Sequence, residues 1–122
     1  MASPEQQKQL QALSDDYSSL QNELQTTVAA RQKLESQQQE NRGVKSEFAN
    51  LDDDANIYKL VGPILLKQEV SEAKSTVDGR LDFIQNEINR IEKQISDIQE
   101  KSEEKKMAVF QLQTDIQQTG QA

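Results

Sequence analysis

The sequence predicts a mainly α-helical fold: a long antiparallel two-helix coiled coil with a β-hairpin at its centre. Only 34% of its 122 residues are hydrophobic and 4% are aromatic, too little apolar volume for an ordinary globular core. Apolar residues recur at steps of three and four on both sides of the middle, as in a coiled-coil seam. Between these regions, residues 57–68 form the only strand-like stretch. At this length we expect one domain, residues 1–122.

The first helix is predicted over about residues 4–51. Ser3 can cap it, Pro4 suits the first helical position, and Gln6 completes a capping box with Ser3. Three aspartates at positions 52–54 favour its end, because Asp is a poor helix former and like charges repel. Its seam begins with Leu10, Leu13, Tyr17, Leu20 and Leu24.

The seam of this first helix then becomes polar. The next positions are Thr27 or Val28, Arg31, Leu34, Gln38 and Asn41. The apolar pattern resumes with Val44, Phe48 and Leu51, after one step of three where a step of four was due. Such a slip locally overwinds a coiled coil, and Gly43 lies beside it.

The second helix, predicted over about residues 71–119, has a more regular seam. It starts near Ser71, where Glu72 suits the positive end of the helix dipole. One register is kept without a break by Val70, Lys74, Val77, Leu81, Ile84, Ile88, Ile91, Ile95, Ile98, Ser102, Lys105, Val109, Leu112, Ile116 and Thr119.

The two helices are predicted to fold back on each other. Each covers about 46 residues and is therefore roughly 70 Å long. Helices of equal length on either side of a reversing linker favour antiparallel pairing. Matching residues whose numbers sum to about 126 places Leu10 beside Ile116, Leu13 beside Leu112, Leu34 beside Ile91 and Phe48 beside Val77. The alternative is that each helix dimerises separately.

The linker reads as two strands around a tight turn. Residues 57–61 and 64–68 are rich in strand formers, and Gly62 and Pro63 separate them. This pairs Val61 with Ile64, Leu60 with Leu65, and Tyr58 with Lys67, while the turn type stays open. Both faces of the ribbon are apolar and a lone hairpin is marginal in water, so we expect hairpins of other subunits, rather than this chain's own helices, to cover it. The candidate assembly residues are Ile57, Tyr58, Leu60, Val61, Gly62, Pro63, Ile64, Leu65 and Leu66.

Composition excludes several classes of function. With no Cys and no His, disulfides, zinc sites and Cys- or His-based catalysis are excluded, and no catalytic residue, cofactor site or metal ligand is indicated. The four glycines are far apart and form no phosphate-binding loop. A net charge of −7 argues against a nucleic-acid partner. We recognise no signal peptide and no membrane span, so a cytoplasmic protein without a membrane partner is expected.

The central stretch, residues 58–81 (YKLVGPILLKQEVSEAKSTVDGRL), resembles the centre of a β-class prefoldin subunit. The most specific part is YKLVGP, followed by Lys67, Gln68 and Glu69. The flanking helices are similar to the family in length and heptad pattern. A single hairpin fits the β class, since the α class carries an additional one.

The resemblance implies a heterohexamer of two α-class and four β-class subunits, whose hairpins join an oligomeric β-barrel from which six coiled coils hang. It also implies ATP-independent holding of unfolded proteins, notably actin and tubulin chains, and their delivery to the cytosolic chaperonin. The alternative function is a structural coiled-coil tether or oligomerisation adaptor, which would use the heptads but would not need the hairpin.

Antiparallel pairing places both termini at the end remote from the hairpin. The candidate client-binding residues there are Leu10, Leu13, Val109, Phe110, Leu112 and Ile116, with Met107 nearby. Lys105 and Ser102 are expected opposite Leu20 and Leu24, in a weak layer that lets the end splay and expose its seam. The alternative is that these seam residues stay paired. Several weak tips acting on one client would bind by avidity.

Overall fold

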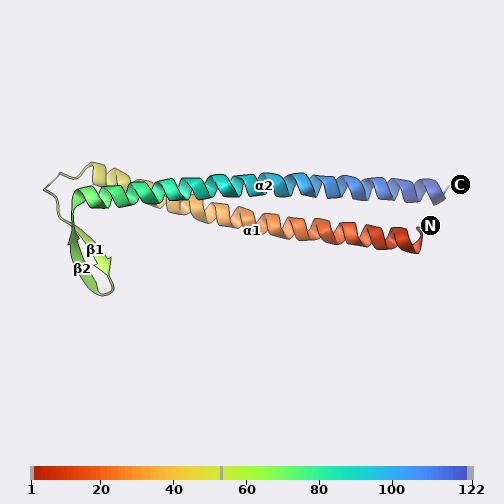
Figure 1. The fold of residues 1–122 in the computed structure, drawn as a ribbon, viewed down its shortest axis with the longest axis horizontal. Coiled ribbons are helices and arrows are strands. Elements are labelled where there is room, and N and C mark those ends of the chain that lie inside the picture. Colours follow the sequence, from red (N-terminus) through yellow and green to blue (C-terminus); the bar gives the residue numbers. More distant parts are fainter. Residues whose placement is uncertain (1, 53, 121–122) are drawn as a thin grey trace. The chain divides into compact units, whose positions relative to one another are not determined.

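Two long helices and one two-stranded sheet make up the computed structural model, which describes residues 2–52 and 54–120. In chain order they are α1 (Pro4–Ala49), β1 (Ile57–Val61), β2 (Ile64–Gln68) and α2 (Val70–Gly120) (Figure 1). The mainly helical fold with a central hairpin is thus confirmed. The chain divides into two compact units. We call Met1–Ala30 with Ile91–Ala122 the terminal unit, and Arg31–Arg90 the hairpin unit.

The start of α1 is a complete capping box. The Gln6 amide donates to Ser3 Oγ at 3.1 Å, and the Ser3 amide donates to Gln6 Oε1 at 3.0 Å. Each bond satisfies a backbone donor that has no partner inside the helix. The cap is therefore the one that the sequence predicted.

The end of α1 comes two residues earlier than expected, at Ala49. The amides of Asn50 and Leu51 bond to carbonyls three residues back, at 3.1 and 3.2 Å, which tightens the chain as it leaves the helix. Of the three aspartates expected to end the helix, Asp53 lies outside the described residues.

The start of α2 lies one residue before the predicted position. The amide of Ala73 donates to the Glu69 carbonyl at 3.0 Å, so Glu69 stands at the N-cap and Val70 opens the helix. Glu72 lies in the first turn, where its charge is favourable.

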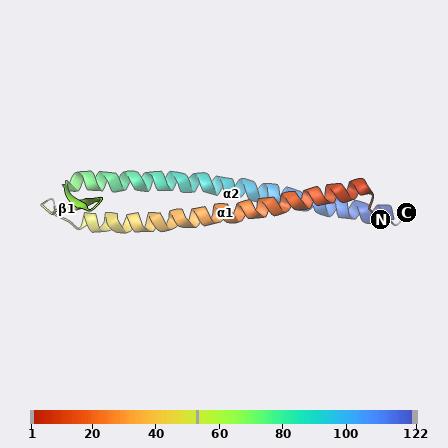
Figure 2. The ribbon, with the colours of Figure 1, turned by 90° about the horizontal axis from the view of Figure 1, so that it is seen from below.

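In the terminal unit, α1 and α2 run side by side in opposite directions (Figure 2). Gln21 Nε2 donates to Ser102 Oγ at 2.7 Å, and Lys105 Nζ lies 3.2 Å from Asp16 Oδ2. Going up in number on α1 therefore means going down on α2, which makes the pairing antiparallel.

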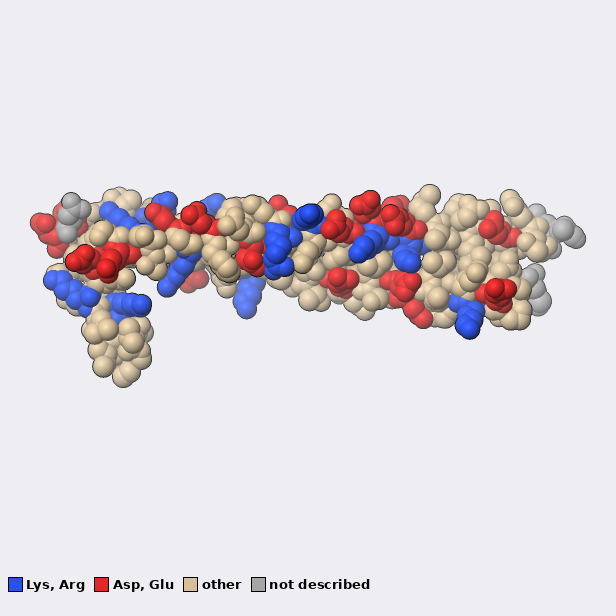
Figure 3. Space-filling view, viewed as in Figure 1, with Lys and Arg blue, Asp and Glu red and all other residues tan. Residues whose placement is uncertain are grey.

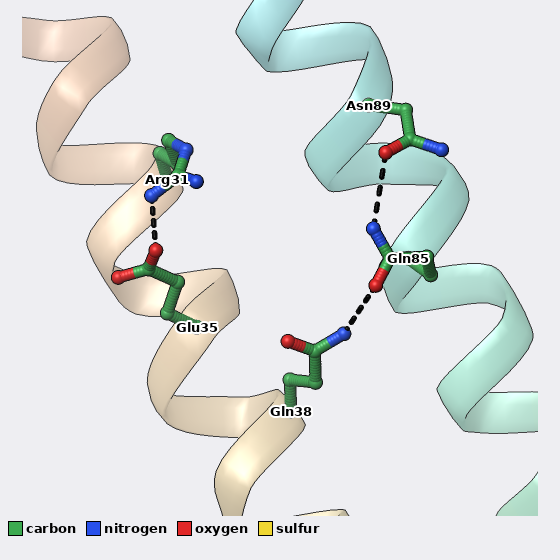
Figure 4. Close-up of polar contacts among 5 residues, drawn as sticks. All are labelled: Arg31, Glu35, Gln38, Gln85 and Asn89. Atoms are coloured by element: carbon green, nitrogen blue, oxygen red, sulfur yellow. Dashed lines mark hydrogen bonds and ion pairs between the residues drawn. The ribbon is translucent and has the colours of Figure 1, made fainter.

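In the hairpin unit the two helices are also antiparallel. Gln38 Nε2 donates to Gln85 Oε1 at 2.7 Å, and Lys45 Nζ lies 2.9 Å from Asp78 Oδ1. Gln85 Nε2 in turn donates to Asn89 Oδ1 at 3.0 Å, so a short chain of amides crosses between the helices (Figure 4).

The predicted seam of α1 is the face that the structure covers. The sequence allowed either Thr27 or Val28 at one seam position. Thr27 takes it, because Thr27 is half-buried and Val28 is 37% exposed. Leu51 was wrongly placed in the seam: it lies beyond the last turn of α1 and is exposed. The half-buried seam residues are Leu10, Leu13, Tyr17, Leu20, Leu24, Thr27, Arg31, Leu34, Gln38, Asn41, Val44 and Phe48.

The buried residues of the described chain lie on α2. Most are β-branched seam residues, and Ser102 is buried with them at 6% exposure. The sequence missed Ala73, which is 4% exposed and is buried more fully than its neighbour Lys74. Thr119, the last predicted seam position, is exposed. The buried apolar residues are Val70, Ala73, Val77, Ile84, Ile88, Ile91 and Ile98.

The polar contacts between the helices favour a register about three residues from the predicted one, although two of the predicted neighbour pairs do lie together. Among the described residues, four polar contacts between the helices join residues whose numbers sum to 121 or 123, not 126. A shift of three or four residues again places seam against seam, so apolar periodicity does not distinguish these registers. Leu13 and Leu112 nevertheless line one groove, and Phe48 and Val77 line another, because a seam side chain packs between positions of the facing helix.

The hairpin has the predicted register. Val61 pairs with Ile64, Leu60 with Leu65, and Tyr58 with Lys67, in an antiparallel ladder. Gly62 has a φ of +60° and is followed by Pro63, whose ring holds φ negative. A positive φ at the first central residue only is the pattern of a type II′ turn, which matches the twist of paired strands.

Candidate functional site: an exposed hairpin and a terminal tip

The hairpin presents apolar side chains on both of its faces. Because side chains alternate along a strand, Val61, Ile64 and Leu66 share one face, and Leu60 and Leu65 share the other with Tyr58. The first three side chains are 47, 58 and 51% exposed, and the last three are 69, 63 and 56% exposed. Neither face is therefore covered by this chain.

The charged residues of the two strands are Lys59 and Lys67. In Figure 3 the hairpin is the projection at lower left, and its free end is tan throughout. The alternative that the chain's own helices cover the strands is thus wrong. An uncovered two-stranded ribbon with two open edges is a template for further strands.

At the other candidate surface, in the terminal unit, the six predicted residues fall into two groups. Phe110 is 66% exposed and lies on the face of α2 that also carries Met107, which is 60% exposed. The other five residues are half-buried: Leu10, Leu13, Val109, Leu112 and Ile116. We call these six residues and Met107 the terminal tip. Apolar surface is thus open there while the seam residues remain in contact.

The two polar residues of the layer that was expected to weaken this tip, Ser102 and Lys105, both have partners on α1. Ser102 accepts the hydrogen bond from Gln21, and Lys105 forms its ion pair with Asp16. The sequence missed these partners because Gln21 and Asp16 lie just outside the α1 seam. Both polar groups on α2 therefore have partners with the helices closed.

A shallow groove of about 500 Å³ runs between the two helices within the terminal unit. Ala12 on α1 and Ala108 on α2 leave the space, and half-buried Leu13 and Leu112 lie beside them. The sequence did not point to this groove, because alanine is neither a strong seam residue nor a charged one. We call it the alanine groove; it is lined by Gln9, Ala12, Leu13, Ala108, Gln111, Leu112 and Asp115.

Two ion pairs of the described residues lie within single helices and are partly exposed. Arg31 pairs with Glu35 one turn away (Figure 4), and Arg90 Nη2 lies 2.8 Å from Glu87 Oε2. The hydrogen bond from Arg90 lowers the pKa of Glu87 below its ordinary value. Such partly exposed pairs, one turn apart on a helix, add only a few tenths of a kcal/mol to stability.

Within the described parts of the chain, no three Asp or Glu residues gather in a way that could hold a metal ion. In residues 2–52 and 54–120, no helix is both long enough and apolar enough to cross a membrane. What distinguishes this molecule is exposed apolar surface on a hairpin and on a helical tip.

A protein-family model described as prefoldin subunit matches residues 11–116, which include most of both helices and the whole hairpin. The chain belongs to the prefoldin family. The prediction made from residues 58–81 is thus confirmed, and as a member of this family the chain is a chaperone-type subunit of a prefoldin complex.

Two similar relatives are both named prefoldin subunit 6. Prefoldin subunit 6 of Homo sapiens is 45% identical over 111 residues, which cover 91% of this chain and 86% of that protein. Prefoldin subunit 6 of Saccharomyces cerevisiae is 48% identical over 104 residues, covering 85% and 91%. Within the β class, residues 58–81 most resemble subunit 6, and the names of these relatives agree with that resemblance.

A crystal structure of the prefoldin β subunit from Thermococcus strain KS-1 has the same fold. It superposes with a TM-score of 0.78 at 28% identity, over 83% of this chain and 89% of that subunit. The likeness to a β-class prefoldin agrees with the single hairpin seen here.

Proposed function

We propose that this prefoldin subunit holds unfolded proteins of the actin and tubulin class at its terminal tip, without ATP, and passes them to the cytosolic chaperonin. The observation that carries the proposal is the exposure of Phe110 and Met107, at 66 and 60%. An unfolded chain offers apolar side chains, and it can associate only with apolar surface that is open in the free holder.

The hairpin is the element that we assign to assembly. Its strands expose six large apolar side chains and two open edges, and a family member works as one of several subunits. Hairpins of neighbouring subunits would add strands to both edges and form the oligomeric β-barrel of a heterohexamer with two α-class and further β-class subunits. In this proposal residues 1–122 act as one domain, in the cytoplasm.

Weak contacts at one tip are sufficient in such an assembly. Two exposed side chains offer little affinity for a client by themselves. When several subunits present tips to the same unfolded chain, later contacts become intramolecular and avidity raises the overall affinity. Weak individual contacts also let the client leave for the chaperonin without an energy source.

The test is removal of residues 1–10 and 113–122 from this subunit within the assembled complex. This takes away Leu10 and Ile116 and shortens the tip, while the hairpin and most of the seam remain. Light scattering of a denatured client diluted into intact or trimmed complex, at equal concentration, should show weaker protection by the trimmed one. The loss will be partial, because the other subunits still bind.

A structural tether would behave differently. The trimmed subunit must first be shown to be incorporated, by co-purification with the other subunits. Equal protection by the trimmed and intact complexes would then remove this tip from client holding and leave the chain an architectural role. That outcome would favour the adaptor function over the holder.

A further inference from the structure

The alanine groove offers a way to hold a client that does not need the helices to separate. Its opening lies where small residues on both helices, Ala12 and Ala108, face the same space. Half-buried Leu13 and Leu112 add apolar atoms to the same lining. A large residue at either alanine would fill this space, so the groove depends on two small side chains on two different helices.

The rim of the groove is polar and carries one sign of charge. Gln111 Nε2 donates to Asp115 Oδ1 at 3.0 Å, which holds that carboxylate beside the opening. Among the residues that line the groove, none is Lys or Arg. A peptide that places an apolar side chain in the groove would therefore be favoured if its next residue were basic and disfavoured if it were acidic.

The helices can stay paired while the groove is occupied. The bonds from Gln21 to Ser102 and from Lys105 to Asp16 hold the same unit together on the side away from the chain ends. If a client bound by opening the seam at these contacts, the polar groups would lose their partners. The seam could open without that loss only between these contacts and the chain ends. Binding in a preformed groove has no such cost.

We propose that the alanine groove takes an apolar side chain of an unfolded client, that Asp115 selects a neighbouring Lys or Arg, and that the seam stays closed. The proposal rests on the proposed function, because it names the segment that the terminal tip holds. Its occupant is a short apolar segment with a basic flank.

The experiment uses the assembled complex and two unstructured peptides with a central photoreactive leucine, one with Lys flanks and one with Glu flanks. After illumination, peptide attached to this chain is located and counted by mass spectrometry, which separates this chain from its neighbours. We expect attachment to the groove residues, with the Lys-flanked peptide favoured by about two- to fivefold. Asp115→Asn should abolish that preference.

Filling the groove tests its role directly. The double variant Ala12→Gln, Ala108→Gln should lower attachment to this chain roughly tenfold, the equivalent of losing one buried apolar side chain. The matched control is Ala29→Gln, Ala30→Gln, which changes two exposed alanines of the same unit outside the groove and should leave attachment unchanged. Attachment that is insensitive to filling would overturn the proposal.

A locked tip separates the groove from an opening seam. The chain has no cysteine, so Asp16→Cys with Lys105→Cys can be joined by a short thiol-reactive crosslinker. Attachment that survives the lock and is lost when Ala12 and Ala108 are replaced by Gln supports the groove. Attachment lost on locking shows that the seam must open, which overturns the groove but leaves client holding at the tip. No attachment anywhere in the terminal unit, with client still bound by other subunits, would overturn both proposals.

Discussion

Gln21 and Ser102 join the two helices of the terminal unit through a hydrogen bond of 2.7 Å from Nε2 to Oγ. Ser102 is 6% exposed and is the buried polar residue among the described positions of the α2 seam, in line with isoleucines and valines. A polar residue inside an apolar seam weakens the coil relative to an apolar one. Ser102 has its partner Gln21, beside the α1 seam, only when the helices are aligned as they are here. This contact therefore helps to select the register that periodicity left open.

The first prediction concerns this pair. Ser102→Ala and Gln21→Ala should each destabilise the subunit modestly, and a double-mutant cycle should show a coupling of about 0.5–1.5 kcal/mol, the usual net contribution of one hydrogen bond. The measurement is chemical denaturation followed by circular dichroism. Additive effects of the two changes would mean that the bond contributes nothing to stability in solution.

The second prediction compares two isoleucines of the same seam. Ile91 is 6% exposed and Ile95 is half-buried. Ile91→Ala should reduce the free energy of unfolding by roughly 2–5 kcal/mol if the helices relax little around the cavity. Ile95→Ala should reduce it by less, because water already reaches that side chain. Equal losses, or a greater loss at Ile95, would contradict the burial order of α2.

The third prediction concerns assembly. Leu60→Asp with Leu65→Asp places two charges on one face of the hairpin, where burial against a neighbouring subunit would cost several kcal/mol, so the variant should not co-purify with other prefoldin subunits. The helices should still form. The matched control is Met107→Asp with Phe110→Asp, since those two side chains are similarly exposed, at 60 and 66%. Assembly lost in the control, or kept in the hairpin variant, would refute the assignment.

The fourth prediction uses two glycines with free space around them. An added Cβ meets nothing within 4 Å at Gly62 or at Gly43, so packing does not distinguish them. Gly62 has a φ of +60°, where Ala is strained, and Gly62→Ala should weaken the hairpin by about 1–2 kcal/mol. Gly43 is helical, and Gly43→Ala should stabilise α1 by about 1 kcal/mol. Thermal unfolding of the two variants should shift in opposite directions; shifts of the same sign would rule out the turn geometry as the cause.

Local pattern alone determined much of this protein. The capping box of Ser3 and Gln6, the seam positions of both helices and the pairing of Leu60 with Leu65 depend on residues close in sequence. Heptad steps, caps and turn residues act over a few residues, so they can be read directly. The exposed apolar hairpin followed too, because two short strands have two faces and no means of covering both.

Only the tertiary structure decided how the helices meet. Shifting one helix by half a heptad again matches seam with seam. The choice between the predicted register, in which paired residue numbers sum to 126, and one in which they sum to about 123 therefore depended on Gln21, Asp16 and other residues beside the seam. The alanine groove was hidden for the same reason: Ala12 and Ala108 acquire meaning only when two distant segments face each other. Periodicity along one helix records which face is covered, whereas register and grooves are properties of two surfaces in contact.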